Sequence, residues 1–133
     1  MRRFILEEEA SDLITMLRHM DAILVDTGSF WWRVRKLWAA GAERYLGSGM
    51  PELEKKSIHL DGLLVEAAVM RAFLGSSGQL YEGIFEAWSD SRLSRCIASF
   101  DGMDQSVWQI ETEDLWFGNE LSKRGIREVI SFG

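Results

Sequence analysis

The chain has 133 residues, which suits one domain, and 47% hydrophobic with 27% charged residues is an ordinary mix for a folded protein. A formal net charge of −6 argues against free nucleic acid or an anionic membrane as the main partner, because both attract positive charge. A single cysteine rules out an internal disulfide, and no stretch approaches the roughly 20 apolar residues of a membrane span. We therefore expect one domain over residues 1–133, located in the reducing cytoplasm.

The first half of the chain is predicted to be helical. Apolar residues recur at spacings of three and four over residues 7–25, which indicates an amphipathic helix, and residues 2–6 could form a short strand before it. A turn at 26–29 leads to a second predicted helix over 30–46, where Trp31, Val34 and Trp38 fall on one stripe. Pro51 suits the first turn of a third helix, which keeps the helical spacing to about residue 74.

The second half is predicted to mix helices and strands. Glycine and serine at 75–78 form a connector, and a short fourth helix is predicted over 79–88. Residues 95–100 and 106–112 suit a hairpin, since Trp108, Ile110 and Thr112 alternate with polar residues. Residues 113–124 are predicted to form a helix that Gly125 closes, and residues 126–132 a final strand.

The predicted fold is therefore α+β and predominantly helical. It has about five helices and a small antiparallel or mixed sheet, formed mainly by the C-terminal third. The predicted core draws on apolar residues from all of these elements: Leu13, Leu17, Leu24, Val34, Trp38, Leu60, Leu64, Val69, Phe73, Ile84 and Ile97.

The sequence contains no motif for catalysis, for a cofactor or for a metal, and we expect none of these groups. His19 and His59 are the only histidines, and each lies two residues before an aspartate, a spacing that does not bring both side chains to one helix face. An enzyme would need a site assembled from dispersed residues. The groups to suspect would be His19, His59, Asp61 and Cys96, and a pocket joining a histidine to a carboxylate would support this alternative.

An aromatic and basic run occupies residues 31–36. Trp31, Trp32, Arg33, Arg35 and Lys36 could stack on bases and follow the backbone of single-stranded nucleic acid. The run is short and the chain is acidic, so a helix with a tryptophan core and a solvated basic face is the favoured interpretation. A further alternative is a homo-oligomeric ligand-binding domain, with the Trp31 and Trp38 stripe buried between subunits.

The strongest functional signal is an acidic, aromatic segment over residues 101–120. It has six acidic residues and no basic one, with Trp108, Trp116 and Phe117 interleaved. Aromatic anchors ringed by charge are typical of protein–protein hot spots, although a strand whose aromatics face the core gives the same pattern. The predicted partner-binding residues are Asp104, Trp108, Glu111, Glu113, Asp114 and Trp116.

The leading hypothesis is a non-enzymatic protein that neutralises or chaperones a basic protein partner, such as a toxin or an effector. Acidic groups would speed the encounter with that partner, and the bound chain would block its active surface. Small size, acidity and the lack of cysteine pairs are shared by many toxin-immunity proteins, secretion chaperones and phage-encoded inhibitors. This likeness concerns general properties of the chain, and no sequence motif is shared.

Overall fold

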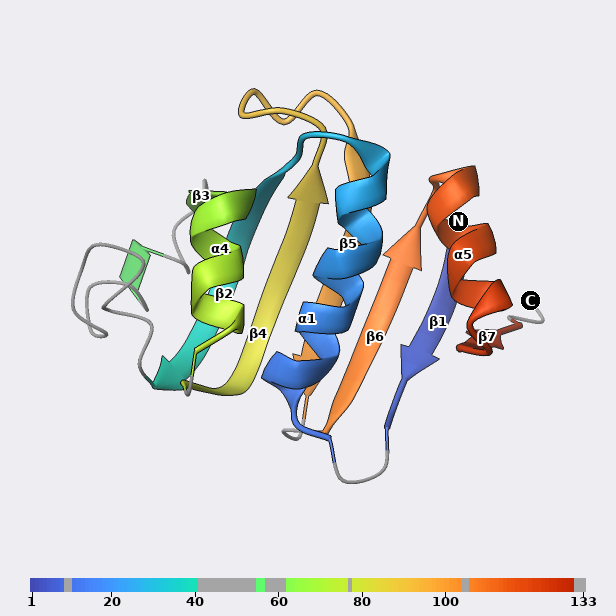
Figure 1. Cartoon of the computed structure of the whole chain (residues 1–133), viewed down its shortest axis with the longest axis horizontal. Helices are drawn as coiled ribbons and strands as arrows, with labels where there is room; N and C mark the ends of the chain where they lie inside the picture. Colours follow the sequence, from blue (N-terminus) through green and yellow to red (C-terminus); the bar gives the residue numbers. More distant parts are fainter. Residues whose placement is uncertain (9–10, 41–54, 57–61, 77, 104–105, 131–133) are drawn as a thin grey trace.

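The computed structural model describes residues 1–8, 11–40, 55–56, 62–76, 78–103 and 106–130 (Figure 1). Within these residues, seven strands form one sheet in the order β3-β2-β4-β5-β6-β1-β7, and all neighbouring strands are antiparallel. The strands in chain order are β1 (Arg2–Leu6), β2 (Trp31–Ala40), β3 (Leu63–Glu66), β4 (Gln79–Trp88), β5 (Cys96–Met103), β6 (Val107–Thr112) and β7 (Arg127–Val129).

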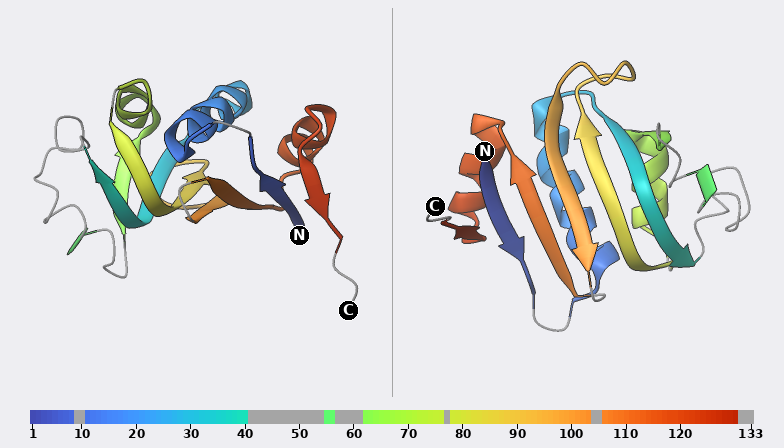
Figure 2. Two further views of the ribbon diagram at one scale, coloured as in Figure 1. Left: turned by 90° about the horizontal axis from the view of Figure 1, so that it is seen from below. Right: turned by 180° about the vertical axis from the view of Figure 1, so that it is seen from behind.

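Three helices lie on one face of this sheet: α1 (Leu13–Leu24), α4 (Ala67–Leu74) and α5 (Leu115–Lys123). A short 3-10 turn, Val25–Thr27, follows α1. Asp12 begins α1 as its N-cap, because its carboxylate accepts a hydrogen bond of 2.9 Å from the Thr15 amide. In the view from behind, the opposite face of the sheet carries no described helix (Figure 2).

The core lies between the helices and the sheet and is rich in aromatic rings. Trp32, Phe85, Phe100 and Trp108 are fully buried, and their ring centroids lie 5.7 to 6.4 Å apart in mostly edge-to-face contacts. Gly102 leaves room for Trp108, because a Cβ at that position would lie 2.8 Å from the indole ring. Such close packing makes this aromatic cluster the rigid centre of the fold.

The prediction of a predominantly helical fold is wrong. Strands take 43% of the described residues and helices 32%, and this part of the chain holds three helices where about five were expected for the whole chain. The predicted helices over 30–46 and 79–88 are contradicted by two long paired strands, β2 and β4. On β2, Trp32 and Val34 are buried and alternate with partly exposed neighbours, and a bulge beyond Val34 then shifts the buried positions to Leu37 and Ala39.

Other predicted elements are confirmed. The strand at 2–6, the first helix, the hairpin, the helix after residue 113 and the last strand all occur, with shorter bounds for the helices and for β7. Much of the third predicted helix lies outside the described residues, and its last part forms β3 and α4.

The predicted core is correct for about half of its members. Leu13, Leu17, Leu24, Val34, Phe73 and Ile97 are buried, whereas Trp38 and Leu64 are 54% and 40% exposed. Val69 and Ile84 are partly exposed, and Leu60 lies outside the described residues. Trp38 and Leu64 are exposed because β2 and β3 turn them toward the face of the sheet that no described helix covers.

Candidate protein-interaction site

The predicted contact residues do not form one surface. Trp108 is fully buried in the core, and its indole Nε1 donates a hydrogen bond of 3.0 Å to the Leu13 carbonyl oxygen. Glu111 lies on the helix-free face of the sheet, and Asp104 lies outside the described residues. Glu113 and Trp116 are exposed, at the beginning of α5. The described part of the segment therefore contributes one side chain to the core, one to the helix-free face of the sheet and two to the surface at the beginning of α5.

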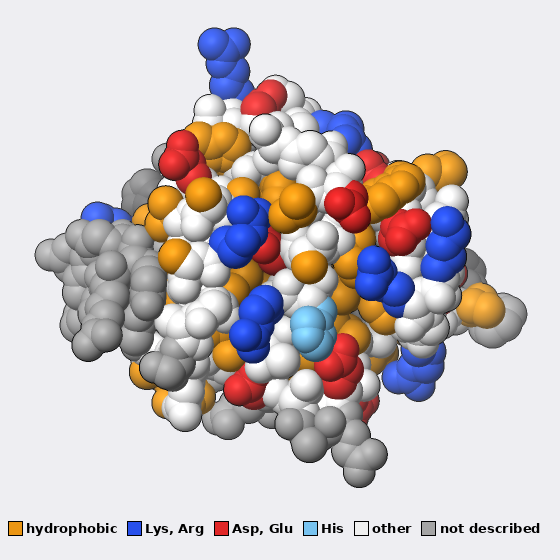
Figure 3. All heavy atoms as spheres, in the orientation of Figure 1, with side chains coloured by type: hydrophobic (Ala, Val, Ile, Leu, Met, Phe, Trp, Pro, Cys, Tyr) orange, Lys and Arg blue, Asp and Glu red, His pale blue; other side chains and the backbone are white. Residues whose placement is uncertain are grey.

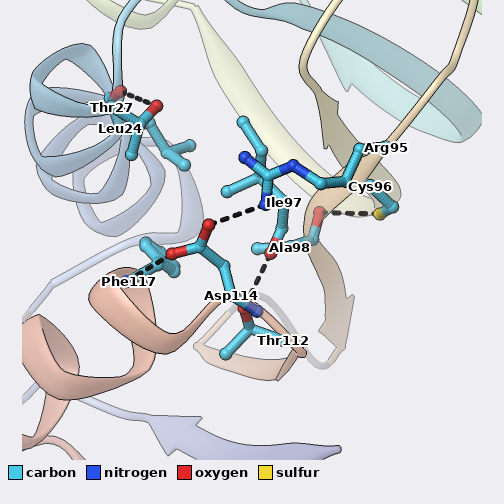
Figure 4. Close-up of polar contacts among 9 residues, drawn as sticks. All are labelled: Leu24, Thr27, Arg95, Cys96, Ile97, Ala98, Thr112, Asp114 and Phe117. Atoms are coloured by element: carbon cyan, nitrogen blue, oxygen red, sulfur yellow. Dashed lines mark hydrogen bonds and ion pairs between the residues drawn. The ribbon is translucent and has the colours of Figure 1, made fainter.

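Asp114 holds the beginning of α5 in place (Figure 4). Its carboxylate accepts hydrogen bonds of 2.7 Å from the Phe117 amide and 2.8 Å from Arg95 Nη1. The Asp114 amide donates to Thr112 Oγ1, and that hydroxyl donates to the Ile97 carbonyl oxygen. Burial alone would raise the pKa of Asp114, but the hydrogen bonds from Phe117 and Arg95 outweigh it and hold the pKa below its usual range.

The acidic run over residues 101–120 is largely neutralised by basic side chains from elsewhere in the chain. Asp114 pairs with Arg95 at 2.8 Å, and Glu111 lies 3.5 Å from Arg3. Glu120 pairs with Lys123 at 3.3 Å. Among the acidic residues of this run that the structure describes, Asp101 and Glu113 form no ion pair with a basic side chain. The negative field suggested by the sequence is therefore much reduced on the folded surface.

An exposed apolar pair follows Glu113 directly. Leu115 is 70% exposed and Trp116 is 42% exposed, both in the first turn of α5. We call Glu113, Leu115 and Trp116 the α5 patch. Figure 3 shows hydrophobic and acidic side chains side by side over the beginning of this helix. Sequence reasoning found Glu113 and Trp116 but missed Leu115, which it treated as part of a helix without assigning it a face.

The helix-free face of the sheet, which we call the open face, carries a second group of aromatic and charged side chains. Trp31 and Trp88 are cross-strand neighbours near one end of β2 and β4. Toward the other end, the rings of Trp38 and Tyr81 lie 5.3 Å apart. The aromatic and basic run over residues 31–36 thus forms part of a strand, with Trp32 in the core and Trp31 on the open face.

Ion pairs fill the space between these two aromatic pairs. Arg33 Nε donates to Glu86 Oε1 at 2.6 Å, and the Trp88 indole donates to the same oxygen at 3.1 Å. The Arg33 guanidinium also lies over the Trp88 ring, 5.3 Å from its centroid. Lys36 pairs with Glu82 farther along the same strands. The cations on which nucleic acid would depend are therefore already bound to carboxylates, which weakens the nucleic-acid interpretation.

The described residues do not assemble the dispersed active site that was considered as an alternative. The His19 side chain is 54% exposed and lies 3.5 Å from Glu8 on the surface, while His59 and Asp61 lie outside the described residues. Burial, followed by the charge of Glu86, raises the pKa of the Cys96 thiol to about 11, so this thiol is a poor nucleophile. The described part of the chain also holds no group of three metal-binding side chains.

A surface cleft of about 570 Å³ lies between the end of α1 and the beginning of α4. Arg71 lines it, and its Nε donates a hydrogen bond of 2.8 Å to the buried carboxylate of Asp21. Glu66 lines the same cleft, so the cleft wall carries both a basic and an acidic side chain.

Among the helices that the structure describes, no segment has the length and hydrophobicity of a membrane span.

Comparisons with protein-family models, with curated proteins and with solved structures found no match.

Proposed function

We propose that this chain is a non-enzymatic protein-binding module and that its partner binds the α5 patch. One observation carries the proposal: Leu115 and Trp116 stand 70% and 42% exposed side by side on the first turn of α5. Burial of an exposed leucine and tryptophan against a partner removes apolar surface from water and so contributes favourable binding free energy. Tryptophan is also among the residues most enriched in the hot spots of protein interfaces.

The rigidity of the α5 patch supports this proposal. Asp114 caps α5 and ties it to Arg95, and Phe117 anchors the same turn in the core. Leu115 and Trp116 are therefore held on a pre-ordered helix, and binding would lose little conformational entropy there.

The charge beside the patch favours a particular kind of partner. Glu113 is exposed without a basic partner among the described residues, and the chain as a whole carries a net charge of −6. We therefore propose a partner with an apolar pocket and basic groups at its rim, such as a toxin or effector that the chain neutralises or chaperones in the cytoplasm. The mechanism would be steric, with the bound chain covering the partner's active surface.

The experiment compares capture of partners from a lysate of the native host by three tagged forms of the chain. These are the wild type, the double variant Leu115→Ser/Trp116→Ala and the control Trp38→Ala, which removes a tryptophan on the open face that is 54% exposed. We expect one stoichiometric basic partner with the wild type and the control, and at least tenfold weaker capture by the double variant. Equal capture by the wild type and the double variant would refute the assignment of the α5 patch.

A further inference from the structure

The open face has the composition of a protein interface. Tryptophan, tyrosine and arginine are the residues most enriched in hot spots, and this face carries Trp31, Trp38, Tyr81, Trp88 and Arg33 on two neighbouring strands. Trp38 is 54% exposed, and Leu64 on the adjacent strand β3 is 40% exposed. No described helix covers these side chains.

The electrostatics of this face point to a second copy of the same chain as its occupant. Two copies each carry a net charge of −6, so they repel unless they meet at a neutral surface. The open face is such a surface. Glu86 pairs with Arg33 at 2.6 Å and lies 3.8 Å from Arg35, Glu82 pairs with Lys36, and Glu111 lies 3.5 Å from Arg3.

At the Arg33–Glu86 pair, desolvation would not oppose this contact strongly. Burying a charged pair normally carries a penalty of several kcal/mol for each ion. The side chains of Arg33 and Glu86 are only 17% and 12% exposed in the single chain, so most of their hydration is already removed. The Trp88 indole supplies a further hydrogen bond to Glu86, which leaves the pair well satisfied.

The arrangement along the strands is compatible with two-fold symmetry. An isologous interface brings the same patch of both subunits together. Because an aromatic pair stands at each end of the open face on β2 and β4, aromatic side chains meet aromatic side chains when each strand packs over its own copy and the two copies run oppositely. The ion pairs between those ends then meet the equivalent neutral region of the other copy.

The area of the open face is close to what a stable dimer needs. Five neighbouring strands, β2, β4, β5, β6 and β1, contain five to ten residues each. At about 4.8 Å between strands and 3.3 Å per residue they cover roughly 600 Å² before side-chain relief is added. Stable interfaces bury about 800 Å² per partner, and twisted sheets pack face to face over such areas.

We propose that the open face is the interface of a homodimer, with Trp31, Trp38 and Trp88 of each copy packed against the same face of the other. The proposal is independent of partner binding at the α5 patch, because the two surfaces do not share a residue. It also gives the Arg33–Glu86 pair a further role, because this pair would lie within the contact.

The test is the molar mass of the purified full chain, measured by sedimentation equilibrium over a wide concentration range. We expect the wild type to approach twice its 15.2 kDa chain mass. Trp38→Glu places a charge in the proposed interface at an exposed position and should raise the dimer dissociation constant at least tenfold. Trp116→Glu makes the same chemical change at the other exposed tryptophan and should leave it unchanged. Circular dichroism confirms that both variants are folded.

Two results would overturn the dimer. One is a wild type that stays at the mass of one chain up to its solubility limit. The other is a dimer that Trp116→Glu dissociates and Trp38→Glu does not. A monomeric wild type whose partner capture depends on the α5 patch would overturn the homodimer alone and leave the proposed function standing.

Discussion

Trp108 on β6 and Leu13 at the beginning of α1 are joined by a hydrogen bond of 3.0 Å from the indole Nε1 to the carbonyl oxygen. Both side chains are fully buried, so this bond ties the first helix to the middle of the sheet. The polar edge of Trp108 is thus used inside the fold, which explains why a tryptophan in an acidic segment does not face a partner.

The first prediction contrasts the two tryptophans of that segment. We expect Trp108→Ala to lower the free energy of unfolding by about 3–5 kcal/mol, since it leaves a large cavity and removes the bond to Leu13. Trp116→Ala should change it by less than about 0.5 kcal/mol, because Trp116 lies at the surface. Urea unfolding followed by circular dichroism measures both. Equal losses in the two variants would contradict the assignment of Trp108 to the core.

The acidic run shows why the candidate site could be predicted only in part. Composition showed correctly that residues 101–120 carry no basic side chain. It could not show that Arg3 on β1 and Arg95 in the β4–β5 connection lie against acidic residues of this segment. Pairing between residues far apart in the sequence depends on strand order, and no local pattern reports strand order. The sequence therefore predicted the exposed position of Trp116 correctly, but it did not predict that Trp108 is buried in the core.

Secondary structure was predictable where the apolar residues followed a single regular spacing. The apolar spacing of α1 and the alternation of β6 each identify the correct element. On β2 the residues Trp31, Val34 and Trp38 are spaced by three and four positions, as on a helix face. The bulge beyond Val34 interrupts the alternation that would have indicated a strand. Tryptophan and valine favour strands, and this preference was the signal that could have corrected the helical interpretation.

The second prediction concerns the Arg33–Glu86 pair. We expect Glu86→Ala to lower the free energy of unfolding by about 2–4 kcal/mol, because it leaves Arg33 partly buried without its carboxylate and Trp88 without an acceptor. Replacing both partners, as in Arg33→Met/Glu86→Met, should bring stability back to within about 1 kcal/mol of the wild type. Urea midpoints of the single and double variants decide this. A double variant as unstable as Glu86→Ala would show that the pair is not coupled.

The third prediction follows from the lowered pKa of Asp114. Because this pKa is lower in the folded state than in the unfolded state, ionised Asp114 stabilises the fold above its ordinary pKa of about 4. That contribution is lost as the pH falls through the folded-state pKa. We expect Asp114→Asn, which keeps the cap but loses the charge, to be less stable than the wild type at pH 7, and we expect this difference to shrink as the pH falls below about 4.

The measurement for Asp114 is urea unfolding at pH 7, 4 and 3, with Asp114→Ala as a second variant. Alanine removes the cap as well as the charge, so it should lose a further ~1 kcal/mol at every pH. A gap between the wild type and Asp114→Asn that stays constant with pH would show that the bond to Arg95 contributes no charge-dependent stability.

The last prediction concerns the thiol of Cys96, whose pKa of about 11 reflects burial first and the nearby charge of Glu86 second. At pH 8 a thiol with this pKa has roughly two hundred times less thiolate than an ordinary cysteine of pKa ~8.5, so alkylation by iodoacetamide should be slowed to a similar degree. Glu86→Gln removes the nearby charge and should speed the reaction, whereas Glu82→Gln on the same strand should not. A Cys96 that reacts at pH 8 as fast as free glutathione would contradict this environment and revive its candidacy as a nucleophile.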